Sequence, residues 1–186
     1  MILPVFVYGQ PVLRKKGRTI KEEEMPEIRT LVENMWETMY ASHGVGLAAH
    51  QIGKDLKLFI IDSIQVEEDM EDLVGMKKVF INAEKVEESG EEWTFEEGCL
   101  SFPDIRGTVE RPSVITLKYR DLDFKEHIET FDGFNARVIQ HEYDHTMGEL
   151  FIEKFKPLKR RLLKKKLDKI KNGEAKASYP VRVYRK

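Results

Sequence analysis

One short segment of the chain, His141-Glu142-Tyr143-Asp144-His145, combines residue types that can hold a metal ion and activate water. Residues four apart on a helix share a face, so His141 and His145 can both offer an imidazole to one metal ion. Glu142 would then lie beside any water on that ion. The pattern fixes only three positions, so a chance match on a charged surface helix is the alternative. A third ligand must come from elsewhere in the chain.

The single cysteine, Cys99, is the first candidate for the third ligand. It lies in Glu97-Gly98-Cys99-Leu100-Ser101, directly after a predicted strand. A thiolate there would complete a three-ligand site that keeps the fourth tetrahedral position open, as hydrolysis requires. A lone cysteine is more often a small core residue, and His43, His50 and His127 are further candidates. The residues alone leave the third ligand open.

Three segments together resemble the signature of the peptide deformylase family. They are, in order, Gly44-Val45-Gly46-Leu47-Ala48-Ala49-His50-Gln51, Glu97-Gly98-Cys99-Leu100-Ser101 and Gln140-His141-Glu142-Tyr143-Asp144-His145. The opening Tyr8-Gly9-Gln10-Pro11-Val12-Leu13-Arg14 is also similar to the start of the family, so the resemblance covers residues 1–155. His50 departs from the commonest pattern, which has Pro or another small residue there. We assign His50 no catalytic role and expect it only to alter the mouth of the site.

The resemblance implies a hydrolase that removes the N-formyl group from the N-terminal formyl-methionine of nascent polypeptides and releases formate. It also implies one divalent metal ion held by Cys99, His141 and His145, whose bound water is the nucleophile. The family implies Fe(II) in the cell. Two imidazoles and a thiolate also suit zinc, nickel or cobalt, any of which can occupy purified protein.

The resemblance further assigns the catalytic and binding groups. Glu142 would act as general base and then as general acid. Gln51 and the backbone N–H of Leu100 would stabilise the developing oxyanion. Arg106 matches a basic position that in the family helps to bind the peptide, and a solvated arginine is the alternative.

The face of the metal-binding helix extends beyond the two histidines. Phe134 and Val138 precede His141 and His145 at offsets of four, three and four, so the apolar pair continues the metal face by two turns. We expect this face to line a methionine pocket, with an opposite wall from the first signature segment. Simple core packing is the alternative. The opposite wall is predicted to consist of Gly44, Val45, Gly46 and Leu47.

Hydrophobic periodicity predicts three helices. The first covers residues 26–42, begins at Pro26 and stops before Gly44. The second runs from Phe134 to Thr146, and a final basic helix runs from Pro157 to about residue 173. Residues 44–51 are predicted to be a loop.

Short strands are predicted at 56–62, 78–86, 91–95, 114–119 and 126–131, with a surface loop at 65–72. Ser89-Gly90 and the segment 121–123 supply turn residues. The predicted class is α+β: a single domain of mostly antiparallel short strands around a central metal-binding helix, with an N-terminal helix and a basic C-terminal helix.

Length and composition limit the class of protein. The chain has 186 residues, which suits one domain over residues 1–186. A net charge of -2 excludes a strong overall bias toward nucleic acid or acidic membranes. The apolar opening residues 1–8 have no basic leader and stop at Gly9, so neither a signal peptide nor a membrane span fits. We expect a cytoplasmic monomer.

The C-terminal region carries a local excess of positive charge. Ten Lys or Arg residues between Lys154 and Lys171 face one acid, Asp168. We define residues 156–172 as a basic C-terminal helix and 173–186 as a tail, with Leu158, Leu162 and Ile170 predicted to face the body. Family members dock on the ribosome through a C-terminal helix, which this segment resembles in placement and charge. A solvated face is the alternative.

Two other functions remain open at this stage. A zinc metallopeptidase would use the same two-histidine helix with another third ligand. A non-enzymatic, metal-stapled ribosome-binding protein would need neither Glu142 nor Gln51, so the presence of both residues argues against it.

Overall fold

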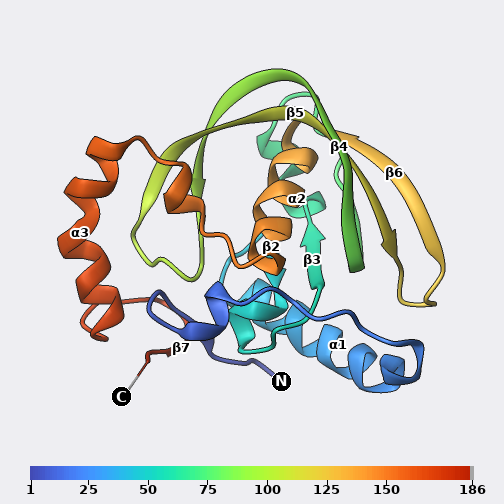
Figure 1. The fold of residues 1–186 in the computed structure, drawn as a ribbon, viewed down its shortest axis with the longest axis horizontal. Coiled ribbons are helices and arrows are strands. Elements are labelled where there is room, and N and C mark those ends of the chain that lie inside the picture. The colour runs from blue at the N-terminus through green and yellow to red at the C-terminus, as the bar shows by residue number, and fades with distance from the viewer. Residues whose placement is uncertain (185–186) are drawn as a thin grey trace.

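The computed structural model describes residues 1–184 and contains a five-stranded sheet with helices on both faces (Figure 1). The strand order is β2-β3-β4-β5-β6, and every neighbouring pair is antiparallel. This arrangement confirms the α+β class with a mostly antiparallel sheet. The strands are β2 (Gly46–Ala48), β3 (Leu58–Asp62), β4 (Lys77–Gly98), β5 (Arg106–Arg120) and β6 (Glu126–Asp132).

Strand β3 lies between the two helix layers, which is why all five of its residues are buried. Successive side chains of a strand point to opposite faces. Leu58 and Ile60 therefore pack into the core around helix α1 (Met25–Ala41), whereas Phe59 and Ile61 pack into the core under helix α2 (Gly133–Thr146). An uninterrupted apolar strand is the sequence signature of burial on both faces.

Helix α1 confirms the helix predicted over residues 26–42. Pro26 lies in its first turn, where backbone N–H groups have no partner within the helix, so the missing N–H of proline costs no hydrogen bond. The side chains that face the sheet recur at spacings of three and four. The chain leaves the helix through His43, whose φ of 58° is left-handed. The buried face consists of Met25, Ile28, Val32, Met35 and Met39.

The longest strand was not predicted correctly. The strands predicted at 78–86 and 91–95 are one strand, β4, and Ser89-Gly90 makes no turn. The register of the β4–β5 ladder shifts between Ser89 and Glu92, and Gly90 there has a φ of +78°, which glycine adopts without strain. The middle of β4 is exposed and belongs to an arch above the core (Figure 1), so no burial pattern revealed its continuity.

Three further segments differ from expectation. The predicted loop 44–51 contains β2 and the 3-10 helix η3 (Ala49–Ile52). The acidic segment predicted as a loop over 65–72 largely forms the 3-10 helix η4 (Ile64–Asp69). Strand β5 begins at Arg106, well before the predicted residue 114. The prediction of short strands is therefore wrong for β4 and β5.

The C-terminal helix α3 (Pro157–Lys171) packs on the body through a different face from the one predicted. Leu163 and Ile170, two turns apart, are buried in a core cluster with Phe102. Leu158 and Leu162 are 69% and 71% exposed. The predicted inward stripe is thus wrong for these two leucines, because each lies roughly 100° or more around the helix axis from Leu163, at about 100° per residue.

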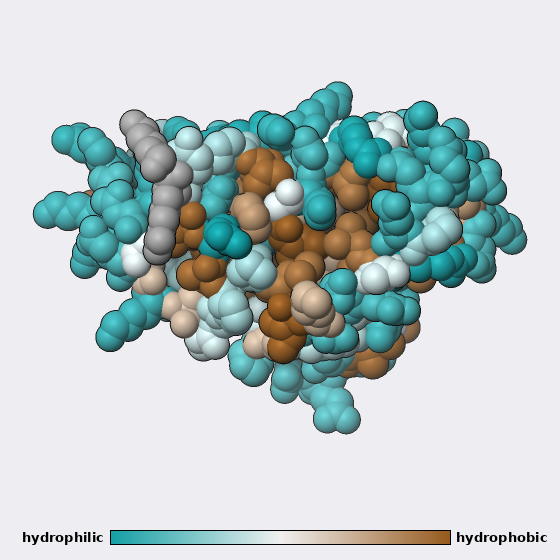
Figure 2. All heavy atoms as spheres, turned by 90° about the horizontal axis from the view of Figure 1, so that it is seen from below, coloured by the Kyte–Doolittle hydropathy of each residue, from teal (hydrophilic) through white to brown (hydrophobic). Residues whose placement is uncertain are grey.

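Short elements complete the chain. A two-stranded parallel sheet joins β1 (Val5–Phe6) to β7 (Val181–Arg182), a pairing that the sequence did not predict. The remaining 3-10 helices are η1 (Pro11–Arg14), η2 (Glu22–Glu24) and η5 (Phe151–Lys154). Within residues 1–184, no helix is both long and apolar enough to cross a membrane. Figure 2 shows hydrophobic side chains across the middle of one face and hydrophilic ones at both ends, including the end occupied by α3.

Candidate metal centre

The predicted metal ligands converge at the core of the molecule. His141 and His145 project from one face of α2, and Cys99 lies in the turn that follows β4. The three possible ligand atoms all lie within 4.8 Å of one another, and Cys99 Sγ is 3.3 Å from His145 Nε2. Both histidines are buried, whereas Cys99 is partly exposed, and Cys99 and His141 line a cavity. Two imidazoles and a thiolate at this spacing fit a tetrahedral ion with one open position.

The turn that carries Cys99 is held by its own backbone. Phe102 N donates to the Cys99 carbonyl at 2.9 Å, and Ile105 N donates to the Phe102 carbonyl at 3.1 Å. The paired residues Gly98 and Arg106 close the ladder on either side. Burial of Phe102 and Ile105 then fixes the turn against the core. The Cys99 thiol is therefore positioned by the end of the β4–β5 ladder, whereas the two histidines are positioned by a helix.

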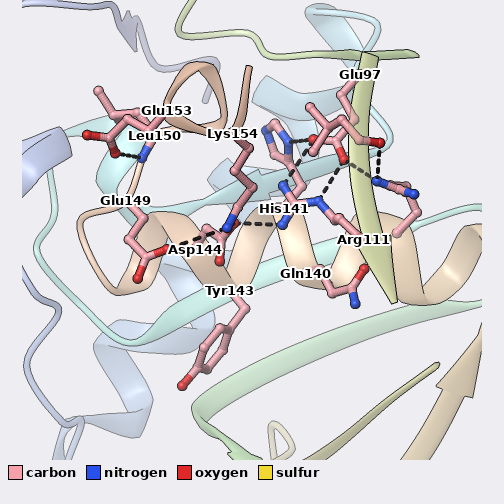
Figure 3. A network of polar contacts seen from close by, with 12 residues as sticks. Glu97, Arg111, Gln140, His141, Tyr143, Asp144, Glu149, Leu150, Glu153 and Lys154 are labelled. Carbon is pink, nitrogen blue, oxygen red and sulfur yellow. Dashed lines mark hydrogen bonds and ion pairs between the residues drawn. The ribbon is translucent and has the colours of Figure 1, made fainter. Parts of the chain in front are cut away.

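A buried ionic network orients His141 through its Nδ1 atom (Figure 3). Glu97 Oε2 lies 2.9 Å from His141 Nδ1, which leaves Nε2 free to face the other ligands. Arg111 binds both oxygens of Glu97, at 2.7 and 3.1 Å, and Arg137 Nη1 donates to Glu97 Oε1 at 2.9 Å. Burial alone would raise the pKa of Glu97, but the bonds from His141 and Arg111 lower it strongly instead. Glu97 is therefore a carboxylate that holds the imidazole of His141 in place.

Arg111 extends this network by one turn along α2. Its Nη1 donates to Asp144 Oδ2 at 2.7 Å, and Lys154 Nζ lies 3.5 Å from the same oxygen. Burial would lower the pKa of Arg111, but Glu97 and Asp144 raise it. The side chains of Glu97 and Arg111 are each only 4% exposed. Such a pair is costly to break, because either partner alone would be an uncompensated buried charge.

Glu142 is buried on the cavity side of α2 without a protein partner for one oxygen. Its Oε2 makes no hydrogen bond among the described residues. Burial raises the pKa of Glu142 to about 7. The carboxyl packs against Gly46, where an added Cβ would lie 2.7 Å from Glu142 Oε1. Glycine at position 46 thus makes room for the Glu142 carboxyl, and a buried carboxyl with a raised pKa in a cavity is a candidate for proton transfer.

Gln51 reaches the cluster from η3. Its Oε1 accepts a hydrogen bond from Ala48 N at 2.8 Å, which fixes the orientation of the amide. Its Nε2 then points to Cys99 Sγ at 3.5 Å and to Ser101 Oγ at 3.4 Å. The side chain of Leu100 packs toward α1, and Gly44 makes room for it, because a Cβ there would lie 2.9 Å from Leu100 Cδ1.

A cavity of about 400 Å³ opens beside the cluster. The described residues place every predicted substrate-binding residue in its lining: Gly44, Val45, Gly46, Arg106, Phe134 and Val138. Leu47 is the exception among the predicted wall residues. It is fully buried in the core around α1, because the alternation of β2 turns it away from the cavity. Arg106 lies at the rim, largely exposed, with its Nε 3.3 Å from Glu96 Oε2.

The sequence model of the polypeptide deformylase family matches residues 2–161. The chain belongs to the polypeptide deformylase family. It is 47% identical to a peptide deformylase of Christiangramia forsetii, with 98% of this chain and 96% of the relative covered. A Flavobacterium johnsoniae peptide deformylase is 48% identical over 96% of this chain and 94% of its own length. The crystal structure of a Legionella pneumophila peptide deformylase superposes with a TM-score of 0.80 at 37% identity, covering 95% of this chain and 99% of that chain.

The chain departs from the usual deformylase signature at His50. This residue is fully buried and does not lie at the mouth of the cavity. The expectation that it alters the entrance is therefore wrong. Within the described residues, neither ring nitrogen of His50 has a hydrogen-bond partner. Burial lowers the pKa of His50, so the imidazole is neutral. The other two candidate histidines do not belong to the ligand cluster: His43 is exposed at the rim of the cavity, and His127 pairs with Asp121 at 2.6 Å.

Several residues that support the deformylase site were not predicted from the sequence. Glu97 is the first residue of the second signature segment. Because a ligand histidine is commonly oriented by a carboxylate, this glutamate could have been predicted as the partner of a histidine. Arg111 follows Gly107 and Val109 at the two-residue period of the buried face of β5. Arg137, on α2, carried no comparable signal. Tyr179, from the tail, also lines the cavity.

Proposed function

We propose that this chain hydrolyses the N-formyl group of formyl-methionine at the N-terminus of nascent polypeptides and releases formate. One observation carries the proposal: the three ligand atoms cluster beside a buried glutamate and a cavity with an apolar wall. Membership of the polypeptide deformylase family supports the same reaction. The family also favours this reaction over peptide cleavage by a metallopeptidase and over a purely structural metal.

Cys99, His141 and His145 would hold one divalent cation. Their separation and the carboxylate behind His141 fit such an ion, because a ligand histidine is normally oriented through its second nitrogen. When bound, the ion supplies Lewis-acid chemistry, lowering the pKa of water and polarising a carbonyl oxygen. We propose Fe(II) as the cellular ion, with zinc, nickel or cobalt able to occupy the same donors.

Glu142 would carry the proton in both halves of the reaction. As general base, it takes a proton from the water that attacks the formyl carbon. The protonated carboxyl then gives that proton to the leaving amine as the C–N bond breaks. A pKa raised toward neutrality by burial suits a group that must both accept and donate.

The oxyanion formed from the formyl oxygen would be stabilised by Gln51 and by the Leu100 backbone N–H. Within residues 1–184, the Leu100 N–H donates to no backbone acceptor, so it is free for a substrate oxygen. Gln51 Nε2 already contacts Cys99 and Ser101, so a substrate oxygen would replace one of these weak contacts. Loss of one such donor typically costs about 2.7–4 kcal/mol of transition-state stabilisation.

The cavity would hold the methionine side chain against α2. Phe134 and Val138 are one wall, Val45 is another, and the glycines at 44 and 46 leave room for the peptide backbone. Arg106 at the rim would meet the peptide farther from the formyl group. An apolar wall with few polar groups is the usual lining of a small-ligand site.

The exposed basic face of α3 would hold the enzyme, as a cytoplasmic monomer, near the ribosome. Nascent chains emerge from a particle coated in RNA phosphate, which attracts clustered Lys and Arg side chains by counterion release. Leu158 and Leu162 are exposed between these charges and would add apolar contact. The tail that follows α3, residues 173–186, is assigned to the same catalytic domain.

The reaction is tested by incubating the metal-loaded protein with formyl-Met-Ala-Ser under anaerobic conditions. We expect formate and free Met-Ala-Ser as the only products. Acetyl-Met-Ala-Ser serves as the matched control, and we expect it to remain intact, since its extra methyl group crowds the site. Cleavage at an internal peptide bond would instead identify a metallopeptidase.

A further inference from the structure

The C-terminal tail is tied to the N-terminus beside the candidate site. Val5 N donates to the Pro180 carbonyl at 2.8 Å, and Val7 N donates to the Arg182 carbonyl at 3.2 Å. Strand β7 and helix α3 flank the turn that follows β4 (Figure 1), and their apolar residues share one core cluster with Phe102. Most of this region lies beyond residue 161, where the match to the family model ends.

Tyr179 lies two residues before β7 and lines the cavity. Its hydroxyl donates to the Leu100 carbonyl at 2.8 Å. The backbone N–H of Leu100 is the group that we assign to the oxyanion. Because Tyr179 binds the backbone carbonyl of the same residue, it holds the short turn that carries this N–H. The neighbouring bond from Tyr8 N to the Ser101 carbonyl, 2.9 Å long, fixes the turn at the next residue.

The cavity is lined by residues from separate regions of the chain. Phe134 and Val138 belong to α2, where the methionine side chain is expected to lie. Tyr179 comes from the tail and is bonded to the turn that follows β4 through its hydroxyl. A cavity of about 400 Å³ lies in the range that holds ligands larger than one amino-acid side chain. The cavity therefore has room for more of a peptide than the methionine side chain.

We propose that Tyr179 is a specificity-determining residue through which the C-terminal tail completes the substrate cleft. Its ring packs against the peptide beyond formyl-methionine, and its hydroxyl positions the Leu100 turn. This inference rests on the proposed deformylation.

The test compares wild type with Tyr179→Ala and Tyr179→Phe, using formyl-Met-Ala-Ser and formyl-methionine amide as substrates. For Tyr179→Ala we expect KM to rise about tenfold for the tripeptide and to stay unchanged for the amide, because only the longer ligand meets the ring. Tyr179→Phe keeps the ring, so it should restore KM. Its kcat should fall about 2- to 10-fold for both substrates, as expected for one lost hydrogen bond.

The dissociation constants of the products Met-Ala-Ser and methionine amide, measured by calorimetry, provide a readout without turnover. Tyr179→Ala should weaken only the tripeptide, again about tenfold. Tyr184→Ala is the matched control, because Tyr184 lies in the same tail and lines a different surface hollow. It should behave as wild type in every assay.

Equal changes for short and long ligands in Tyr179→Ala, or no change for either, would overturn the proposed contact between Tyr179 and the peptide. Wild-type kcat in Tyr179→Phe would overturn the positioning of the turn. If wild type released no formate, the proposed reaction would fail, while the product affinities would still decide whether the tail contacts the peptide.

Discussion

The region around α2 and the region around α3 use charge in opposite ways. Around α2, the side chains of Glu97, Arg111 and Arg137 are at most 4% exposed and bind one another. Along α3, the basic side chains are largely exposed, and within the described residues none of those from Lys156 to Lys171 forms an ion pair. A buried charged side chain destabilises the fold unless it is paired. An exposed charged side chain stays hydrated, so it costs little free energy and remains available to a partner. Substitutions in the first region should therefore damage stability or chemistry, and those in the second should change binding alone.

The largest effect is expected from Glu142→Gln, which removes the proton carrier and keeps the volume of the side chain. Turnover of formyl-Met-Ala-Ser should fall by about 10²- to 10⁴-fold, the usual contribution of general acid–base catalysis. Metal content should match wild type, because the three ligands are untouched. The control is Glu149→Gln, an exposed glutamate just beyond α2. Wild-type turnover by metal-loaded Glu142→Gln would remove Glu142 from the mechanism.

Cys99→Ser should weaken metal binding at least about 100-fold, because loss of a ligand should exceed the 10- to 100-fold cost of losing a residue that only orients one. Metal content and rate should fall together while the circular dichroism spectrum is retained. The measurement is metal retained after dialysis against a chelator. A variant that kept its metal and only lost stability would show that Cys99 is a core thiol.

Glu97→Gln tests the buried network on which the comparison depends. The substitution leaves Arg111 and Arg137 with less negative charge nearby, so the free energy of unfolding should fall by about 3 kcal/mol. Denaturant unfolding measures this loss, with Glu96→Gln as the exposed neighbour that should change stability by less than about 0.5 kcal/mol. Equal midpoints for the two variants would contradict a stabilising role for the network.

The sequence predicted the catalytic groups better than the residues that support them. His141 and His145 were predictable because helix geometry alone puts residues four apart on one face. Cys99 was ambiguous until the resemblance assigned it, since a lone cysteine fits a core as well as a metal site. The partners of Glu97 come from β5 and α2, and tertiary contacts of that kind leave no local pattern.

The same contrast applies to the fold. Helix α1 and strand β3 were predicted because each buries a periodic or continuous set of apolar side chains. The middle of β4 was missed because it is exposed and so has no burial period to read. The inward face of α3 was misassigned because Leu158, Leu162 and Leu163 offer two alternative stripes, and only packing against Phe102 selects Leu163.

The smallest effect is expected in the second region. Reversing four exposed charges of α3 should weaken ribosome binding roughly tenfold at low salt, because fewer counterions are released. Hydrolysis of formyl-Met-Ala-Ser should be unchanged. Sedimentation with purified ribosomes measures the affinity. The four substitutions are Lys159→Glu, Arg160→Glu, Lys164→Glu and Lys165→Glu.

The matched control reverses four exposed lysines elsewhere, with the same change in net charge. If ribosome affinity fell equally in both variants, the attraction would be non-specific. The basic face of α3 would then be a solvated surface with no docking role. The control substitutions are Lys16→Glu, Lys21→Glu, Lys54→Glu and Lys125→Glu.

The most direct test of the metal centre is a titration of the metal-free protein with Fe(II) under anaerobic conditions, with formate release measured at each step. The rate should rise in proportion to added metal and stop rising at one ion per chain, because Cys99, His141 and His145 form one site. Cys99→Ser measured in parallel should show no such break. Formate release from the metal-free protein, or an unchanged titration in Cys99→Ser, would contradict hydrolysis at this centre.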